Sequence, residues 1–322
     1  MGFRQIVDKW RQRAGHILDA TKRIMLPGLG DLSVFDVGSL FVKALSDGTM
    51  GVRSSAIAFN FFLALFPALL FILALIPYIP ILNFQTELIG LIEELVPENI
   101  FDAIEGTILN IAMTPRGGLL SIGFITTIVL VSNGVTAVIK AFNASINVHE
   151  NRTFIGLRVS SLIMMALITL LISIAIALLI FGRTILGILI SKHILYGTFS
   201  KVVFYIVQWL IILTLCFASV SVIYYFAPAK HTKMGFVSIG SMASTTLLLL
   251  TSAAFGFYLS NFSQYNELYG AIGTIIAILV WLNLNAYILL LGFELNLSIA
   301  EAHKNKVELS GVAKGQEVDL NM

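Results

Sequence analysis

The sequence contains little of the chemistry on which enzymes and nucleic-acid-binding proteins depend. Its one cysteine, Cys216, excludes an internal disulfide, a cysteine-based zinc site and an iron–sulfur cluster. Its five histidines are scattered, and none stands at metal-ligand spacing from another. Charged residues make up only 12% of the chain, against about 25% in soluble proteins. The net charge of +2, with no dense basic tract, argues against nucleic acid as a partner.

What the sequence has in abundance is apolar residues. They make up 57% of its 322 residues, and the mean hydropathy is +0.92. A spanning helix needs about 20 mostly apolar residues. Stretches without Asp, Glu, Lys, Arg or His predict six spans, at about 54–79, 118–139, 159–182, 202–227, 235–260 and 271–293. We therefore expect an all-α, polytopic membrane protein whose six transmembrane helices occupy residues 54–298.

The distribution of Lys and Arg predicts which side of the membrane each loop faces. If the N-terminus is inside, the parts 1–53, 140–158, 230–234 and 294–322 are cytoplasmic and hold sixteen Lys and Arg. The outer loops then hold four. Because cytoplasmic loops are enriched in Lys and Arg, we expect both termini to be cytoplasmic.

The segments outside the spans have patterns of their own. Residues 1–25 alternate apolar and basic faces at helical spacing, which is typical of an amphipathic helix on an anionic inner leaflet or of a helix packed under the bundle. A second helix is expected between Ser33 and Gly48. The acidic outer loop 80–117 predicts two short amphipathic helices, and the polar tail 299–322 is expected to be flexible.

Several short motifs occur in a characteristic order. The first span reads AIAFNFFLALFP over residues 56–67, and the second ends in Lys140-Ala-Phe-Asn143, followed by Arg152 and Arg158. The fourth ends in Tyr224-Tyr-Phe-Ala-Pro228. The sixth begins after Tyr269-Gly-Ala-Ile-Gly273 and continues through Trp281 to Leu291-Gly-Phe-Glu-Leu-Asn296. In this order, the motifs of residues 50–298 resemble those of the YihY / virulence factor BrkB family.

The resemblance implies a bacterial inner-membrane protein with about six spans. The family once carried the name ribonuclease BN, its other name links it to serum resistance and virulence, and a role in moving lipid or envelope components has been considered. The residues that the resemblance marks as structural are Pro67, Asn143, Pro228, Tyr269, Gly270, Gly273, Trp281, Gly292 and Glu294.

A ribonuclease would need an acid–base pair or a metal held by carboxylates and histidines. The cytoplasmic neighbours of this kind are His149 with Glu150, and Glu301 near His303, and neither pair has a partner set. We therefore assign no catalytic residue, no metal and no cofactor, and expect a protein that is not an enzyme.

The spans contain amides but no ionisable residue in their interior, which argues against a proton relay. A polar interior for a transported molecule would use Asn60, Asn133, Gln208 and Asn283. The alternative is that each amide makes a hydrogen bond between helices, as membrane bundles do routinely.

Three cations, Lys140, Arg152 and Arg158, are expected at the inner rim, where they either bind lipid phosphate or anchor the loop. The favoured hypothesis is a non-enzymatic protein that binds or moves a lipid or envelope precursor, with membrane lipids as partners. The alternative is a scaffold for envelope-assembly proteins, supported by the predicted helix 1–25.

Overall fold

The computed structural model of the chain describes residues 32–46, 48–78, 114–146, 152–192, 197–229, 235–260 and 271–319, with residues 106, 109, 110 and 150. The helix predicted at 1–25 and most of the loop predicted at 80–117 lie outside the described residues.

The described part is helical. Its elements are α2 (Val34–Ser46), α3 (Thr49–Leu75) followed by the short 3₁₀ turn η1 (Ile76–Tyr78), α6 (Gly117–Ser145), α7 (Phe154–Ser191), α8 (Gly197–Phe226), α9 (Ile239–Ser260) and α11 (Ala271–Asp319). Six helices, namely α3, α6, α7, α8, α9 and α11, are long and apolar enough to cross a membrane. The prediction of an all-α membrane protein with six spans is confirmed.

Several helices extend beyond the predicted spans. Helix α3 begins at Thr49 rather than 54, α6 ends at Ser145 rather than 139, and α7 begins at Phe154 rather than 159. Helix α11 continues past the predicted sixth span to Asp319, and the flexibility of the tail 299–322 stays a prediction. Within this part of α11, Ala302 is buried with Leu32 and Val37 of the α2 region.

Local hydrogen bonds fix where several helices start. Before α2, the Ser33 hydroxyl accepts from the Asp36 backbone N–H at 3.1 Å and donates to the Asp36 carboxylate at 2.7 Å. The Thr153 hydroxyl accepts from the Gly156 N–H at 3.1 Å at the start of α7. These contacts satisfy backbone donors that have no partner within a helix. Between α2 and α3, Gly48 has φ 67°, a left-handed conformation that favours glycine.

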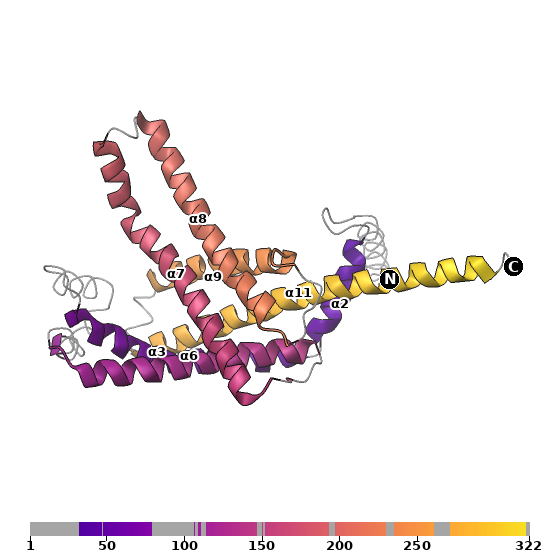
Figure 1. Ribbon diagram of the computed structural model, residues 1–322, viewed down its shortest axis with the longest axis horizontal. Helices are drawn as coiled ribbons and strands as arrows, with labels where there is room; N and C mark the ends of the chain where they lie inside the picture. Colours follow the sequence, from indigo (N-terminus) through magenta and orange to yellow (C-terminus); the bar gives the residue numbers. More distant parts are fainter. Residues whose placement is uncertain are drawn as a thin grey trace, which may run out of the picture.

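The helices form two groups (Figure 1). Helices α3 and α6 lie side by side, and α11 packs against α2, α3 and α9. Helices α7 and α8 form a hairpin whose connected ends, the last turns of α7 and the first turns of α8, project away from the other helices. Close approach of α3 and α6 is possible because Gly134 lies against the ring of Phe61, which an added Cβ would approach to 3.0 Å.

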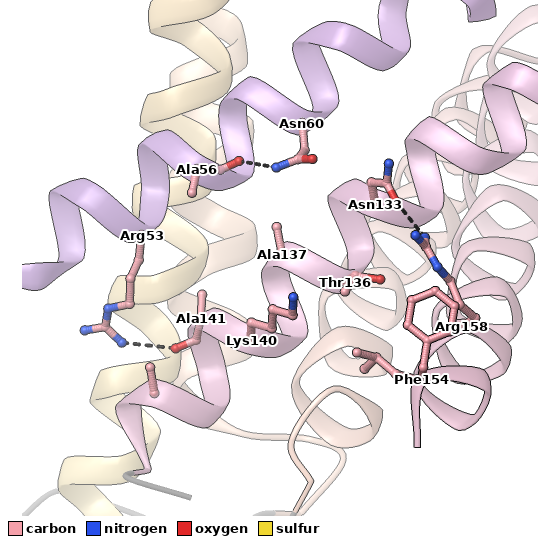
Figure 2. A pocket seen from close by; sticks show the side chains of 12 residues that line it. Arg53, Ala56, Asn60, Asn133, Thr136, Ala137, Lys140, Ala141, Phe154 and Arg158 are labelled. Carbon is pink, nitrogen blue, oxygen red and sulfur yellow. Dashed lines mark hydrogen bonds between the residues drawn. The ribbon is translucent and has the colours of Figure 1, made fainter. Parts of the chain in front are cut away.

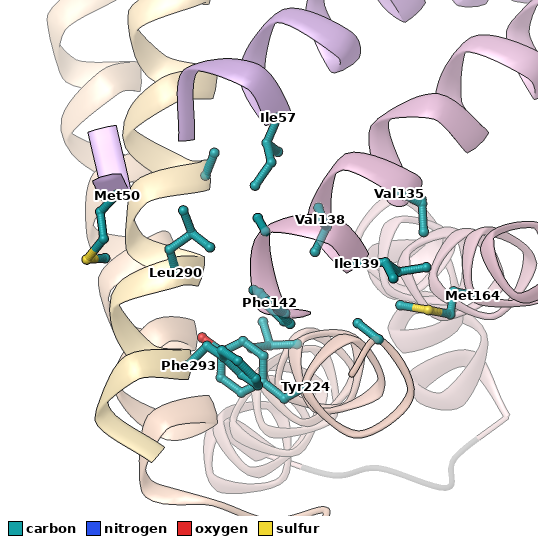
Figure 3. Close-up of a cluster of buried hydrophobic side chains, with 14 of the residues drawn as sticks. Met50, Ile57, Val135, Val138, Ile139, Phe142, Met164, Tyr224, Leu290 and Phe293 are labelled. Carbon is teal, nitrogen blue, oxygen red and sulfur yellow. The ribbon is translucent and has the colours of Figure 1, made fainter. Parts of the chain in front are cut away.

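The core lies where the first halves of α3 and α7, the second halves of α6 and α8 and the middle of α11 meet (Figure 3). Phe142 and Phe293 are fully buried and stack with ring centroids 4.0 Å apart and an interplanar angle of 4°. Tyr224 packs edge-on against both rings, at 5.6 and 5.8 Å. Away from this core, large apolar side chains such as Ile122, Ile180 and Phe257 are exposed, as expected for surfaces that face lipid.

Candidate functional site

A cavity of about 460 Å³ lies between α3, α6 and α7, near the ends at which α3 and α7 begin and α6 stops (Figure 2). Its lining residues are Arg53, Ala56 and Asn60 from α3, Asn133, Thr136, Ala137, Lys140, Ala141 and Ala144 from α6, and Phe154, Leu157 and Arg158 from α7. The lining contains three cations, two amides and no carboxylate. Its volume falls within the range of small-molecule sites, about 300–1,000 Å³.

Helical spacing explains why these residues share one cavity. In α3, Arg53 and Asn60 are seven residues apart, which places them two turns apart on one face. In α6, Asn133 and Lys140 have the same spacing. Between the polar positions stand alanines, whose small side chains leave the space open.

Arg158 is held by neutral partners. Its Nη1 donates to Asn133 Oδ1 at 2.6 Å and, at 3.4 Å, to the hydroxyl of Ser132. The guanidinium also lies 5.5 Å from the centre of the Phe154 ring, in a cation–π contact. Within the described part of the chain, Arg158 has no carboxylate partner. Its positive charge is therefore positioned but not neutralised.

Lys140 is the exposed cation of the cavity. It makes no hydrogen bond or ion pair with the residues that the structure describes. In the view of Figure 2 it lies between Arg53 on one side and Arg158 on the other. An ammonium on a flexible stem in this place is available to a ligand.

Arg53 joins three helices through a buried carboxylate. Its Nη1 donates to Ala141 O at 3.1 Å and to Ser145 Oγ at 2.5 Å. Its Nη2 donates to Thr49 Oγ1 at 3.0 Å and forms an ion pair with Glu294 Oε1 at 3.4 Å. The Ser145 hydroxyl donates to the same Glu294 oxygen at 2.6 Å. This Arg53–Glu294–Ser145 network ties α3, α6 and α11 together beside the cavity.

Arg152 does not line the cavity, although the sequence predicts it at the same rim. Its Nη2 donates to the carbonyl oxygens of Ala227 at 3.1 Å and Pro228 at 2.9 Å, just beyond the end of α8. Its Nε lies 3.6 Å from Glu150 Oε1. The side chain is thus engaged in joining the α6–α7 connection to the end of α8.

Asn143 strengthens the same connection. Its Nδ2 donates to Glu150 Oε2 at 2.6 Å, and its Oδ1 accepts from the Ala229 backbone N–H at 2.8 Å. The motif residues Asn143, Arg152 and Pro228, far apart in sequence, therefore meet in one hydrogen-bonded cluster.

The four predicted interior amides separate into two pairs. Asn60 and Asn133 line the cavity. Gln208 lies instead between α7 and α8, where its Nε2 donates to Leu178 O at 3.0 Å. Asn283 of α11 accepts from the Ser55 hydroxyl at 3.5 Å. The latter two amides connect helices and do not line the cavity.

The motif residues of the sixth span pack this helix against α9. Gly292 brings α11 so close to α9 that an added Cβ would collide with Ser244 Oγ. Asn296 accepts from the Gly240 backbone N–H at 2.7 Å, at the start of α9. Trp281 stacks on Phe255, with ring centroids 5.3 Å apart.

Two other motif residues lie within transmembrane helices. Pro67 lies within α3, and Gly273 is buried in α11. Tyr269, Gly270 and His149 lie outside the described residues.

Sequence reasoning missed Arg53 and Phe154. It treated Arg53 as an ordinary cation before the first span, whereas the residue lines the cavity. The available signal was its seven-residue spacing to Asn60. Phe154 gave no comparable signal, because an aromatic residue at the start of an apolar span is unremarkable without knowledge of the neighbouring Arg158.

No group of three or more His, Cys, Asp or Glu side chains is placed to hold a metal ion among the residues that the structure describes. What the cavity offers chemically is positive charge, amide hydrogen bonding and small apolar surfaces. This combination suits the binding of an anionic group attached to an apolar one.

The six apolar helices, with a cationic cavity between three of them, define a polytopic α-helical membrane protein. The model of the family described as virulence factor BrkB matches residues 41–316, and the chain belongs to this family. The resemblance inferred from the motifs is thereby confirmed.

Relatives share most of the chain. The protein YfkH of Bacillus subtilis, whose name describes it as ribonuclease-like, is 32% identical over 254 residues, covering 79% of this chain and 90% of its own. A protein of Vibrio campbellii named UPF0761 membrane protein is 24% identical over 285 residues, covering 87% of each chain. A UPF0761 membrane protein of Acinetobacter baylyi is 29% identical over 187 residues, which is 58% of this chain and 42% of its own. No solved structure matches the chain.

Proposed function

We propose that the protein is a non-enzymatic inner-membrane protein that binds the anionic headgroup of a lipid or envelope precursor, as a step in holding or moving that molecule. The observation that carries the proposal is the cavity between α3, α6 and α7, which combines Arg53, Lys140 and Arg158 with no carboxylate in its lining. Both termini are cytoplasmic in this proposal, since sixteen of the twenty Lys and Arg then face the cytoplasm.

The position of the cavity agrees with a lipid headgroup. It lies where α3 and α7 begin and α6 ends, so in the proposed orientation it faces the inner leaflet. Apolar side chains, including Phe154 and Leu157, stand beside the cations and offer contact to the first carbons of an acyl chain. The ribonuclease name of the relative YfkH does not enter the proposal, because no acid–base pair accompanies these cations in the cavity lining. The scaffold alternative depends on the helix predicted at 1–25, which lies outside the described residues.

The test is native mass spectrometry of the protein from gently extracted membranes, with bound phospholipid measured per protein. An arginine holds a phosphate through two parallel hydrogen bonds, whereas a lysine offers only a point charge. The variant Arg158→Lys should therefore lose bound anionic lipid while its abundance and insertion stay unchanged. The matched control is Arg116→Lys, the same change in an exposed arginine that does not line the cavity. Equal lipid content in wild type, Arg158→Lys and Arg116→Lys would overturn the proposal.

A further inference from the structure

The three cations of the cavity differ in how far their charge is neutralised. Arg53 is paired with Glu294, which lies at 3.4 Å and also accepts from Ser145. Arg158 contacts the neutral groups of Asn133 and Ser132. Lys140 has no partner within the described part of the chain. Two positive charges, on α6 and α7, therefore remain for a ligand.

Headgroups differ in the charge that they bring to such a site. A phosphodiester carries one negative charge, whereas a phosphomonoester carries about 1.5 to 2 at pH 7, since its second pKa is about 6. A zwitterionic headgroup also brings a cation. The cavity lining has no carboxylate to receive that cation, and Glu294 is already engaged by Arg53 and Ser145.

We infer that the ligand of this cavity is an amphiphile that ends in a phosphomonoester, held by Lys140 and Arg158 together. The inference rests on the proposed function and narrows its ligand class. Arg158 is oriented by Asn133 and Phe154 and so can present two parallel N–H groups to one pair of phosphate oxygens. The ammonium group of Lys140 provides the second positive charge and can bind the third phosphate oxygen.

The experiment compares three lipids with identical dioleoyl chains: phosphatidic acid, a monoester; phosphatidylglycerol, a diester; and phosphatidylcholine, a zwitterion. Binding of each to the purified full-length protein in detergent is measured by native mass spectrometry at pH 7.5. Phosphatidic acid should bind about tenfold more tightly than phosphatidylglycerol or better, because one additional charge pair forms in a partly desolvated site. Phosphatidylcholine should bind weakest.

A second measurement uses the wild-type protein alone, so that it does not depend on the folding of a variant. Below about pH 6 the monoester gains a proton, and the affinity for phosphatidic acid should fall towards the affinity for phosphatidylglycerol. The protein groups charged around the ligand are Arg53, Lys140 and Arg158, with Glu294 behind them. The phosphatidylglycerol series, measured over the same pH range, reports separately any effect of pH on the protein itself.

The variant Lys140→Gln should weaken the binding of phosphatidic acid more than that of phosphatidylglycerol, so that the preference for phosphatidic acid falls to near unity. The matched control is Lys304→Gln, which removes an exposed cation of α11 outside the cavity and should keep the preference. Equal binding of the two anionic lipids by wild type would overturn the monoester inference and leave the proposed function standing. Binding of all three lipids without preference would overturn both. If inorganic phosphate displaced phosphatidic acid at equal concentration, the ligand would be a free anion and not a lipid.

Discussion

The buried ion pair between Arg53 and Glu294 leads to a quantitative prediction. Their side chains are 16% and 7% exposed, and the pair joins the first and sixth spans. Removing one partner of a buried pair typically costs about 3–5 kcal/mol, because the other charge is left without its counter-charge. In Glu294→Ala, Arg53 keeps its contacts to Thr49, Ala141 and Ser145. We therefore expect Glu294→Ala to lower the free energy of unfolding by about 3 kcal/mol, near the lower end of this range.

The amide variant separates the charge from the hydrogen bonds. Glu294→Gln retains an oxygen that accepts from both Ser145 and Arg53, so its cost should be about 1–1.5 kcal/mol. In the double variant Arg53→Gln/Glu294→Gln neither charge remains, and its cost should be smaller than the sum of the two single costs by about 1–2 kcal/mol.

The assay is unfolding by dodecyl sulfate titration in mixed micelles, followed by the fluorescence of the protein's tryptophans. The informative quantities are the free energies of unfolding of the four proteins in the double-mutant cycle. If Glu294→Gln cost nothing, or if the effects of Arg53→Gln and Glu294→Gln were additive, then the ion pair would not stabilise the helix contact and the reasoning would be refuted.

Three further predictions follow from contacts described above. Arg152→Lys should lower the free energy of unfolding by about 1–2 kcal/mol, because a lysine keeps the charge but not both carbonyl hydrogen bonds; a variant as stable as wild type in the same assay would contradict this. Gly292→Ala should destabilise by about 1–3 kcal/mol through a clash at the α9 contact, whereas Gly256→Ala, where an added Cβ meets nothing within 4 Å, should be neutral. In a background lacking Cys216, a cysteine at Ser121 should react with a membrane-impermeant thiol reagent from outside the cell and a cysteine in α2 should not; the reverse pattern would exclude the proposed orientation.

The transmembrane helices were largely predictable, because long apolar runs have few alternatives to a membrane span. The boundaries of these helices were not predictable from the same rule. Searching for stretches without charge ended the predicted spans beside Arg53, Lys140 and Arg158. In the structure each of these residues lies within a helix, at most five residues from one of its ends. The rule that found the spans therefore excluded the residues that line the cavity.

The candidate site was only partly predictable for a related reason. Lys140 and Arg158 were expected at the inner rim, but Arg152 was grouped with them because all three share a charge and a region of sequence. What separates Arg152 is its contact with the carbonyls of Ala227 and Pro228, about 75 residues further along the chain. Spacing along one helix indicates a shared face, whereas contacts between distant segments leave no such periodicity. Charge and spacing therefore predicted Lys140 and Arg158 as candidate site residues, and both line the cavity. They could not show that Arg152 instead joins the α6–α7 connection to the end of α8.

The pairing of the first and last spans also bears on how the chain is made. Arg53 precedes Glu294 by 241 residues, so at about 5–20 residues per second the ribosome needs roughly ten to fifty seconds between the two. During that interval the arginine lacks the carboxylate of the sixth span as its partner. Helix α11 also supplies Phe293 to the core and Asn296 to the start of α9. Assembly of the bundle thus waits for the final segment to enter the membrane, and chains that stop before it should be substrates for membrane proteases.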